Sequence, residues 1–392
     1  MLVRRLLPYL PKRQLCYISN ADIETTKNAP QHTPIFSRDL MSFFQSEEHR
    51  GKYFRLLDMT FGSGSHTCYI LDQFRNNGVK GSVTVYASDC DQESYDLAWK
   101  IIQDRSYDVK ELVPIKSNFK DLDSKLSEKQ VEAETLSGIL IDTGISSLQY
   151  SDRQRGFCHL RDGNLDLRLD PWQGSPRASE VLQTIGKLQK SQFHENSFIL
   201  MIFFIDEASL IRLLKSYGGL KSNARHVTSA IFEARFMDYK FKTVRELHEV
   251  MNQAAKHASL KDHSETDPKF VSELLMKTMV ALRMFVNDEL NQLDYAIRFL
   301  AVKYLKMGGV LAIITHNPAE EKVVQKCFKE LSLESVDLDQ ELTENVSYEL
   351  FQKNTKEFVI STQNWLFIFL YSRRSNRFQV KHHGKSCMEI HH

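Results

Sequence analysis

The stretch "LLDMTFGSGSHTCYIL", from Leu56 to Leu71, decides the fold, because it has the form of a strand, a glycine turn and the start of a helix. Apolar residues run into Asp58, and Gly62 and Gly64 follow with one residue between them. Glycines placed in this way let the backbone approach a ligand closely and leave the first N–H groups of a helix facing it. The turn therefore predicts a site for a nucleotide-like ligand.

The residues around the turn indicate which ligand it holds. A dinucleotide fingerprint wants a third small residue three positions after Gly64, and Thr67 stands there instead. A carboxylate at Asp58 would repel a pyrophosphate, but it would suit a cationic ligand that carries an ammonium and a sulfonium. We therefore expect S-adenosylmethionine, and a nicotinamide-dependent oxidoreductase is the disfavoured alternative.

Strand-like and helix-like patterns alternate along both ends of the chain, which predicts an α/β fold with a Rossmann-like parallel sheet covered on both faces. A long helical pattern from Met279 to Tyr304 is expected to end at "KMGG" (306–309). The strand-like runs lie at 53–59, 82–89, 112–118, 136–144, 310–316 and 365–372. The predicted division is a leader (1–28), a first domain part (29–150), an inserted helical domain (151–268), a second part (269–375) and a disordered tail (376–392).

Acids end two of these strands. Asp89 ends the second run, about 27 residues after Gly62, where a carboxylate can accept both ribose hydroxyls of an adenosine. We favour it over Asp91 because it ends the strand directly; two solvated loop acids are the alternative. Phe119, after the third strand, is placed to stack on adenine or to pack at the sheet edge. Asp142 ends the fourth strand, where it would meet a ligand amine or cap the next segment.

Composition narrows the function classes. Basic and acidic residues number 51 and 50, which argues against a globally basic nucleic-acid-coating protein. Six scattered cysteines without a C-x-x-C pair fit a reducing compartment. No H-E-x-x-H pattern occurs, and we expect no metal site. No apolar run approaches the roughly 18 residues that span a bilayer, so no membrane partner is expected. The acid-poor, basic N-terminus is typical of a mitochondrial transit peptide and predicts the mitochondrial matrix; an ordinary disordered basic leader is the alternative.

Several motifs, in chain order, resemble those of the MraW/RsmH family. Its members are S-adenosylmethionine-dependent N4-cytidine methyltransferases of small-subunit ribosomal RNA. The resemblance covers about residues 30–330, and the block from Asp142 to Asp170 is its most specific part, because that pattern is not a general feature of nucleotide-binding folds. The motifs are "HTP" (32–34), "DMTFGSGSHT" (58–67), "SNF" (117–119), "DTGISSLQYSDRQRGF" (142–157), "GNLDLRLD" (163–170) and "VALRMFVNDEL" (280–290).

The resemblance implies a cofactor site, and four motifs of this chain differ from the family's pattern. Carried over by position, the cofactor contacts fall on Gly64, Ser65, His66, Asp89, Phe119, Asp142 and Gln149. Spacing alone does not single out Gln149. The family's G-G-H is Gly64-Ser65-His66 here, and its D-L-G is "DTG" (142–144). Its Y-G-E-E is "YGGL" (217–220), and its F-H-S-L-E-D-R is "THNPAEEK" (315–322), which keeps His316 and either Glu320 or Glu321.

These residues suggest a mechanism and an RNA surface. Positive charge develops on N4 of cytosine during methyl transfer, so an acceptor for an N4 hydrogen is needed. Asp142, or a backbone carbonyl beside it, is the candidate. The base must be unstacked to enter a pocket, which favours single-stranded or loop RNA.

The inserted helical domain is the candidate platform for ribosomal RNA within an assembling particle, because residues 207–261 hold ten Lys or Arg against five Asp or Glu. A solvated helix face is the plainer explanation. Arg155, Arg161 and Arg168 flank the motifs. The segment 186–205 is expected to be an extra excursion that is disordered or peripheral. A non-catalytic ribosome-assembly factor, favoured by the altered motifs, is the alternative function.

Overall fold

The computed structural model describes residues 37–44, 53–76, 83–171, 174–184, 206–258, 267–334, 357–362, 365–369, 380–382 and 385–388. The predicted leader and the predicted extra segment at 186–205 lie outside these ranges. None of the helices in the described ranges combines the length and the apolar content needed to cross a lipid bilayer.

A seven-stranded sheet forms the centre of the protein, in the order β3-β2-β1-β4-β5-β6-β7. Neighbouring strands pair in parallel except β6 with β7, which are antiparallel. The predicted Rossmann-like α/β fold is confirmed. The order reverses between β1 and β4, and the crevice at such a switch point is where open α/β sheets bind ligands. The strands are β1 (Phe54–Asp58), β2 (Val83–Asp89), β3 (Leu112–Lys116), β4 (Leu136–Asp142), β5 (Leu305–Ile314), β6 (Glu357–Thr362) and β7 (Trp365–Phe369).

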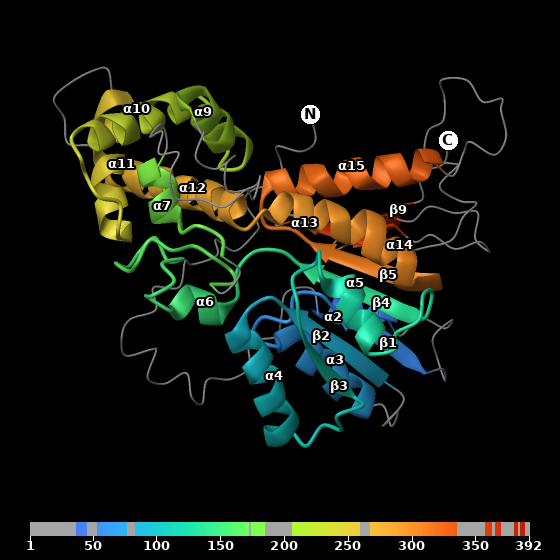
Figure 1. Ribbon diagram of the computed structural model, residues 1–392. Coiled ribbons are helices and arrows are strands. Elements are labelled where there is room, and N and C mark those ends of the chain that lie inside the picture. The colour runs from blue at the N-terminus through green and yellow to red at the C-terminus, as the bar shows by residue number, and fades with distance from the viewer. Residues whose placement is uncertain are drawn as a thin grey trace.

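Helices cover both faces of the sheet, as apolar strands buried on both sides require (Figure 1). On one face pack α2 (Ser37–Phe44), α3 (Ser65–Asn76) and α4 (Gln92–Asp104). On the other pack α5 (Leu122–Glu128), α13 (Glu289–Tyr295), the π-helix η4 (Ala296–Ala301) and α15 (Pro318–Glu334).

A separate helical layer lies beside the sheet, at the upper left of Figure 1, and has its own apolar core. Its α12 belongs to this core through one buried face that includes Leu274, Leu275 and Leu282. The predicted division at 268/269 would assign α12 to the sheet domain instead. The layer consists of α7 (Ala178–Thr184), α9 (Glu207–Ser216), α10 (Asn223–Phe236), α11 (Val244–Ala258) and α12 (Pro268–Val286).

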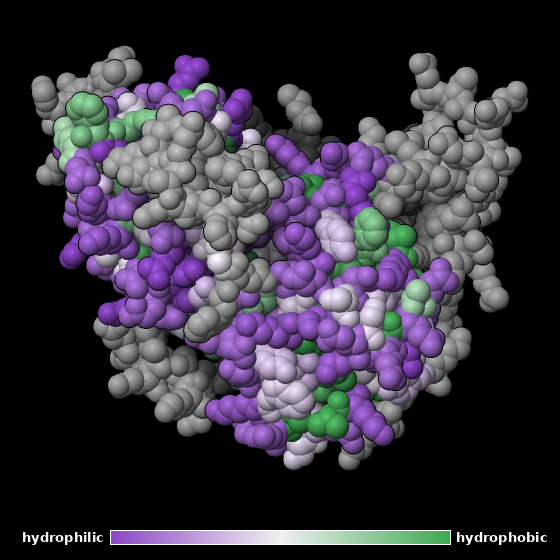
Figure 2. Space-filling view, viewed as in Figure 1, coloured by the Kyte–Doolittle hydropathy of each residue, from purple (hydrophilic) through white to green (hydrophobic). Residues whose placement is uncertain are grey.

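The surface of this layer is mostly hydrophilic in the view of Figure 2, apart from an apolar patch over the end of α10. Phe236 and Met237 stand there with 94% and 77% of their surface exposed. The helix α10 ends at this patch, because Asp238 takes a left-handed backbone conformation at φ 57°.

The long helix predicted between Met279 and Tyr304 is wrong as a single element. It breaks at Asn287 and Asp288, where Asp288 has a left-handed φ of 52°. The Asn287 amide explains the break, since it donates to the Leu167 carbonyl at 2.7 Å and accepts from the Leu169 amide at 2.7 Å. These two bonds connect the end of α12 to the motif block, which is the stretch from Asp142 to Asp170. Helical periodicity does not predict such a contact.

Three further details of the predicted elements differ. The helical segment does end at Tyr304, but "KMGG" lies inside β5, which begins at Leu305 and is irregular where Leu305 and Val310 pair with β4. The sequence pattern missed β6, a short run just before the predicted strand at 365–372. Within the tail predicted to be disordered, β8 (Val380–His382) and β9 (Lys385–Met388) form an antiparallel pair, because a short hairpin needs backbone bonds but little apolar periodicity.

Candidate active site

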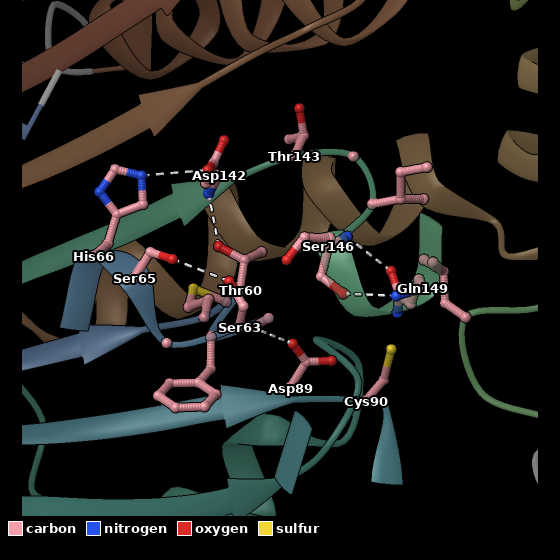
Figure 3. Close-up of a pocket in the computed structure, with 18 of the residues that line it drawn as sticks. Thr60, Ser63, Ser65, His66, Asp89, Cys90, Asp142, Thr143, Ser146 and Gln149 are labelled. Carbon is pink, nitrogen blue, oxygen red and sulfur yellow. Dashed lines mark hydrogen bonds and ion pairs between the residues drawn. The ribbon is translucent and has the colours of Figure 1, made fainter. Parts of the chain in front are cut away.

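A cavity of about 1180 Å³ opens at the carboxyl ends of β1, β2, β4 and β5. It collects the seven residues that the family resemblance assigns to the cofactor site, although they come from separate segments of the chain. These residues are Gly64, Ser65, His66, Asp89, Phe119, Asp142 and Gln149. Figure 3 labels five of them, Ser65, His66, Asp89, Asp142 and Gln149. Residues from the loop before the helical layer and from α13 close the opposite wall, so a ligand would lie between the sheet and that layer.

The glycine loop is shaped by its glycines. Gly62 and Gly64 have left-handed φ angles of 54° and 75°. A Cβ on Gly64 would come within 2.6 Å of the Phe61 ring, so no other residue fits there without movement. Ser65, which replaces the family's second glycine, is the first residue of α3 and needs no special backbone conformation. This departure therefore leaves the shape of the loop intact.

Asp58 does not face the cavity, and our reason for a cationic ligand at that carboxylate is wrong. Its side chain is buried and accepts hydrogen bonds from the Thr67 hydroxyl at 2.6 Å and the Thr60 amide at 3.1 Å. Burial raises its pKa, and these hydrogen bonds oppose that shift. Asp58 ties the end of β1 to α3, and Thr67 stands where a dinucleotide loop has a small residue because it is the partner of Asp58.

Of the two acids near the end of β2, Asp89 lines the cavity and Asp91 does not. Asp89 accepts from the amides of Gly62 at 2.7 Å and Asp91 at 2.9 Å. Burial raises its pKa to about 6, against the effect of these two donors. Asp91 is buried behind it, where it caps α4 and receives hydrogen bonds from Gln149 and Arg155. Each Asp89 oxygen keeps a second lone pair for a ribose hydroxyl.

Gln149 holds the wall of the cavity through three hydrogen bonds, one of which its backbone amide donates to the Ser146 hydroxyl at 3.2 Å. Together with Ser146 it forms a capping box at the start of α6 (Ser147–Ser151), in which its Oε1 accepts from the Ser146 amide at 3.0 Å. Its Nε2 donates to Asp91 at 2.9 Å. Capping signatures are readable in sequence, but the reach to Asp91 is a tertiary contact that spacing could not reveal.

Asp142 lies between two imidazoles (Figure 3 labels it with His66). Its Oδ1 is 2.9 Å from Nε2 of His316, and its Oδ2 is 3.3 Å from Nε2 of His66. Its backbone amide donates to the Thr60 hydroxyl at 2.7 Å. Burial by itself would raise the pKa of Asp142, but the two histidines outweigh it and lower that pKa to about 2. The carboxylate is therefore ionised at neutral pH.

The structure also decides between the two candidate acids of "THNPAEEK". Glu320 is 2% exposed, lines the cavity and accepts from the Thr143 hydroxyl at 2.6 Å. Glu321 points elsewhere on α15 and accepts from Gln325 at 3.1 Å. The family resemblance indicated that one of the two acids belongs to the site but not which one. Glu320 and Glu321 are adjacent, and the sequence alone does not show which side chain faces the cavity.

The three arginines near the motifs serve the fold rather than an open surface. Arg155 is buried, pairs with Asp91 at 3.0 Å and donates to two carbonyls of the motif block. Arg168 holds Asp166 with two hydrogen bonds of 2.6 and 2.8 Å. Arg161 donates to the Tyr150 carbonyl at 3.0 Å. Arg155 and Arg168 therefore have a structural role around the motifs that they flank.

The residues present fit an adenosine-bearing sulfonium cofactor. The close-approach loop at Gly62 and Gly64, the carboxylate of Asp89 after β2 and the ring of Phe119 after β3 line the same cavity as the ionised Asp142. Within the described ranges, no group of three or more His, Cys, Asp or Glu is placed to hold a metal ion.

Comparisons with known proteins agree with these features. The MraW methylase family matches the chain over residues 29–365. The 12S rRNA N(4)-cytidine methyltransferase METTL15 of Mus musculus is 29% identical over 317 residues, which are 80% of this chain and 69% of that protein. The protein of the same name from Homo sapiens is 27% identical over 314 residues, which are 80% of this chain and 68% of that protein.

Two other matches are partial. A Culex quinquefasciatus protein named as a receptor-type tyrosine-protein phosphatase, mosPTP-1, is 30% identical over 76% of this chain, but this chain spans only 18% of its length. A solved SAM dependent methyltransferase from Aquifex aeolicus aligns over 31% of this chain and 55% of that chain, with 16% identity and a TM-score of 0.23. The family match, in contrast, spans most of the sequence. The chain therefore belongs to the MraW methylase family of S-adenosylmethionine-dependent ribosomal RNA methyltransferases.

Proposed function

We propose that this chain transfers a methyl group from S-adenosylmethionine to N4 of a cytidine in mitochondrial small-subunit ribosomal RNA. The observation that carries the proposal is Asp142, an ionised carboxylate oriented by two histidines in the same cavity as the predicted cofactor residues. The mammalian relatives named above act, by their names, on a cytidine N4 of 12S rRNA.

The first half of the site would hold the cofactor. S-adenosylmethionine supplies an electrophilic methyl group on a positively charged sulfur. Asp89 would accept the ribose hydroxyls, and Phe119 would stack on the adenine. The backbone at Gly64, Ser65 and the neighbouring His66 would line the methionine portion. Each of these residues lines the cavity.

Asp142 would act on the cytidine. The N4 lone pair is delocalised into the ring, so the amine becomes nucleophilic only as it pyramidalises and gains positive charge. An ionised carboxylate that accepts an N4 hydrogen stabilises this charge. Each oxygen of Asp142 bonds one imidazole and keeps a second lone pair. His66 and His316 therefore fix the direction of the carboxylate without saturating it.

The base would enter from the side of the helical layer. Leu169, Asp170 and Asn287 line the cavity opposite the glycine loop. A base inside a duplex cannot reach such a site, so a single-stranded or loop cytidine is the fitting target. We propose that an assembling small-subunit particle presents this cytidine, and that the transit-like leader brings the protein to the mitochondrial matrix.

A non-catalytic assembly factor remains the second candidate, because "YGGL" has lost both acids of the family motif. The structure gives this segment a packing role, since a Cβ on Gly218 would come within 2.5 Å of the Lys277 carbonyl on α12. The retained His316 and Glu320 lie in the cavity, which favours catalysis.

Radiolabelled methyl transfer tests the proposal. Purified protein is incubated with labelled S-adenosylmethionine and either free small-subunit ribosomal RNA or partly assembled particles that lack the modification. Digestion to nucleosides should place the label in N4-methylcytidine. Label in another nucleoside would contradict the cytidine assignment. Cofactor binding without transfer to either substrate would favour the assembly factor.

A further inference from the structure

Glu320 is a buried carboxylate that joins both neighbours of Asp142. Its Oε2 accepts from the Thr143 hydroxyl at 2.6 Å and from the His316 amide at 2.9 Å. Thr143 follows Asp142 in the chain, and the His316 ring bonds Asp142 at 2.9 Å. One oxygen thereby fixes the chain on one side of Asp142 and the imidazole on the other.

Helix capping accounts for only part of this arrangement. Glu320 also accepts from the Asn317 amide at 3.1 Å, as the third residue of a capping box does at a helix start. A capping residue is usually exposed, whereas Glu320 is 2% exposed and lines the cavity. The bonds to Thr143 and His316 lie outside the cap, and burying a charge for a cap alone would be costly.

The second oxygen of Glu320 faces the helical layer. Oε1 is buried without a hydrogen-bond partner among the described residues, and it lies 3.7 Å from Nη2 of Arg283 on α12. Arg283 is held by Glu289 through two bonds of 2.8 and 2.9 Å. A continuous chain of charged contacts therefore runs from α12, which packs in the layer, to the side chains around Asp142.

We propose that Glu320 is a positioning residue for methyl transfer: it holds Thr143 and His316 on either side of Asp142 and links their placement to α12 of the helical layer. This inference rests on the proposed function. It assigns to Glu320 no contact with the cofactor or the base. A carboxylate that must meet N4 in one direction loses most of its effect when it is displaced, and a 1 Å misplacement can reduce rate by about 10²-fold.

The test compares Glu320→Gln with Glu321→Gln. The first keeps the size of the side chain but removes the charge that faces Arg283 and weakens the acceptor for Thr143 and His316. The second makes the same chemical change one residue later, on a side chain outside the cavity. At saturating cofactor and RNA, we expect Glu320→Gln to lower kcat by about 10- to 100-fold, because a small misplacement of the reacting groups costs rate on this scale. Cofactor Kd should stay within about twofold, and Glu321→Gln should match the wild type.

A second variant guards against misfolding of the first. Thr143→Val preserves shape and introduces no charge change, but it removes the 2.6 Å bond to Glu320. We expect it to lower kcat severalfold without changing the melting temperature by more than a few degrees. Combining it with Glu320→Gln should add little, because both changes release the same contact.

The His316 ring gives a readout apart from activity. Its pKa is raised, first by the hydrogen bond to Asp142, while burial opposes the rise; the charge of Glu320 adds to it and that of Arg283 subtracts from it. Removing the charge of Glu320 would lower this pKa by itself, so the readout is taken in Thr143→Val, which changes no charge. A shift of the ring titration to lower pH in that variant, measured by NMR, would show that the contact with Asp142 has loosened.

The outcomes separate the inference from the function on which it rests. Unchanged kcat in both Glu320→Gln and Thr143→Val, in an assay where the wild type is active, overturns the positioning role alone. Equal losses in Glu320→Gln and Glu321→Gln also overturn it. A wild-type protein that transfers no methyl group to any RNA refutes the proposed function and this inference with it.

Discussion

Two carboxylates in one cavity are set apart by their surroundings. Asp142 is held by two histidines that keep its pKa at about 2, whereas burial raises that of Asp89 to about 6. The difference in pKa matches the two proposed tasks. Asp142 must stay ionised to stabilise a positive charge, whereas Asp89, which would bind ribose hydroxyls, can be protonated while no cofactor is bound. Sequence spacing found both acids, but it could not predict which one would meet the histidines.

For Asp142 we predict a loss of turnover with little loss of cofactor. Asp142→Asn keeps the size of the side chain and removes the charge that supports a cationic amine. Single-turnover rate at saturating cofactor should fall by about 10²–10³-fold, the scale for one well-placed electrostatic contact. Calorimetry on the same variant should show a smaller change in affinity. An unchanged rate would make a backbone carbonyl of the same loop the acceptor.

For Asp89 we predict a pH-dependent cofactor affinity. Its pKa of about 6 lies above the ordinary value of an aspartate, so the free protein takes up a proton as the pH falls through about 6. The protonated acid is a weaker acceptor for ribose hydroxyls, so affinity should fall below that pH by at most about tenfold per pH unit.

The matched variants isolate the Asp89 contribution from other groups that titrate nearby. Asp89→Asn should weaken binding at pH 7.5 by about 1.5–3 kcal/mol, the range for a charge-assisted hydrogen bond. It should also remove the pH dependence near 6. Asp96→Asn, on the exposed side of α4, is the control and should bind like the wild type. Retention of the pH dependence in Asp89→Asn would assign that dependence to another group.

At the scale of elements, the loop between β1 and α3 depends on where its glycines lie rather than on how many it has. Gly64 combines a left-handed φ of 75° with a Cβ position 2.6 Å from Phe61, whereas Ser65 already belongs to α3. The family's second glycine is therefore dispensable here, and the first is not. The sequence pattern located the loop, but it could not predict the close packing of Gly64 against Phe61.

We predict that Gly64→Ala destabilises the protein more than Gly219→Ala does. Both glycines have a left-handed φ, but a Cβ on Gly219 meets nothing within 4 Å. Gly219→Ala should therefore carry only the backbone cost of about 1–2 kcal/mol. Gly64→Ala should add a clash of about 1–3 kcal/mol. Chemical denaturation measures both free energies of unfolding, and equal values would contradict the close packing at Gly64.

The helical layer has exposed Lys and Arg side chains that could contact RNA phosphates, whereas the buried arginines near the motifs could not. Lys221 and Arg225, at the start of α10, are exposed, whereas Arg155 is tied to Asp91. We predict that the double change Lys221→Ala and Arg225→Ala weakens RNA binding and reduces the slope of log affinity against log salt by about 0.7–0.9 for each lost phosphate contact. Lys129→Ala, at the end of α5, is the control. An unchanged salt slope in the double variant would remove this surface from the RNA platform.

At the scale of the whole molecule, local sequence pattern predicted most of the sheet but none of the features that depend on tertiary contact. Apolar runs located six of the seven sheet strands, because buried parallel strands are nearly continuous apolar segments. The break at Asn287 escaped prediction because its amide is satisfied 120 residues away, at Leu167. The expectation that Asp58 lies beside a cationic ligand was wrong because its side chain is buried and does not face the cavity. The sequence pattern does not show which acids are buried.

The central claim is that this chain places a methyl group on N4 of a mitochondrial ribosomal cytidine through Asp142. Mass-spectrometric mapping of N4-methylcytidine in mitochondrial small-subunit RNA tests it most directly, in cells with the protein, without it, and with the wild-type or Asp142→Asn protein restored. The claim predicts that one N4-methylcytidine disappears without the protein and returns with the wild type but not with Asp142→Asn. Methylation that persists without the protein, or that returns fully with Asp142→Asn, would contradict it.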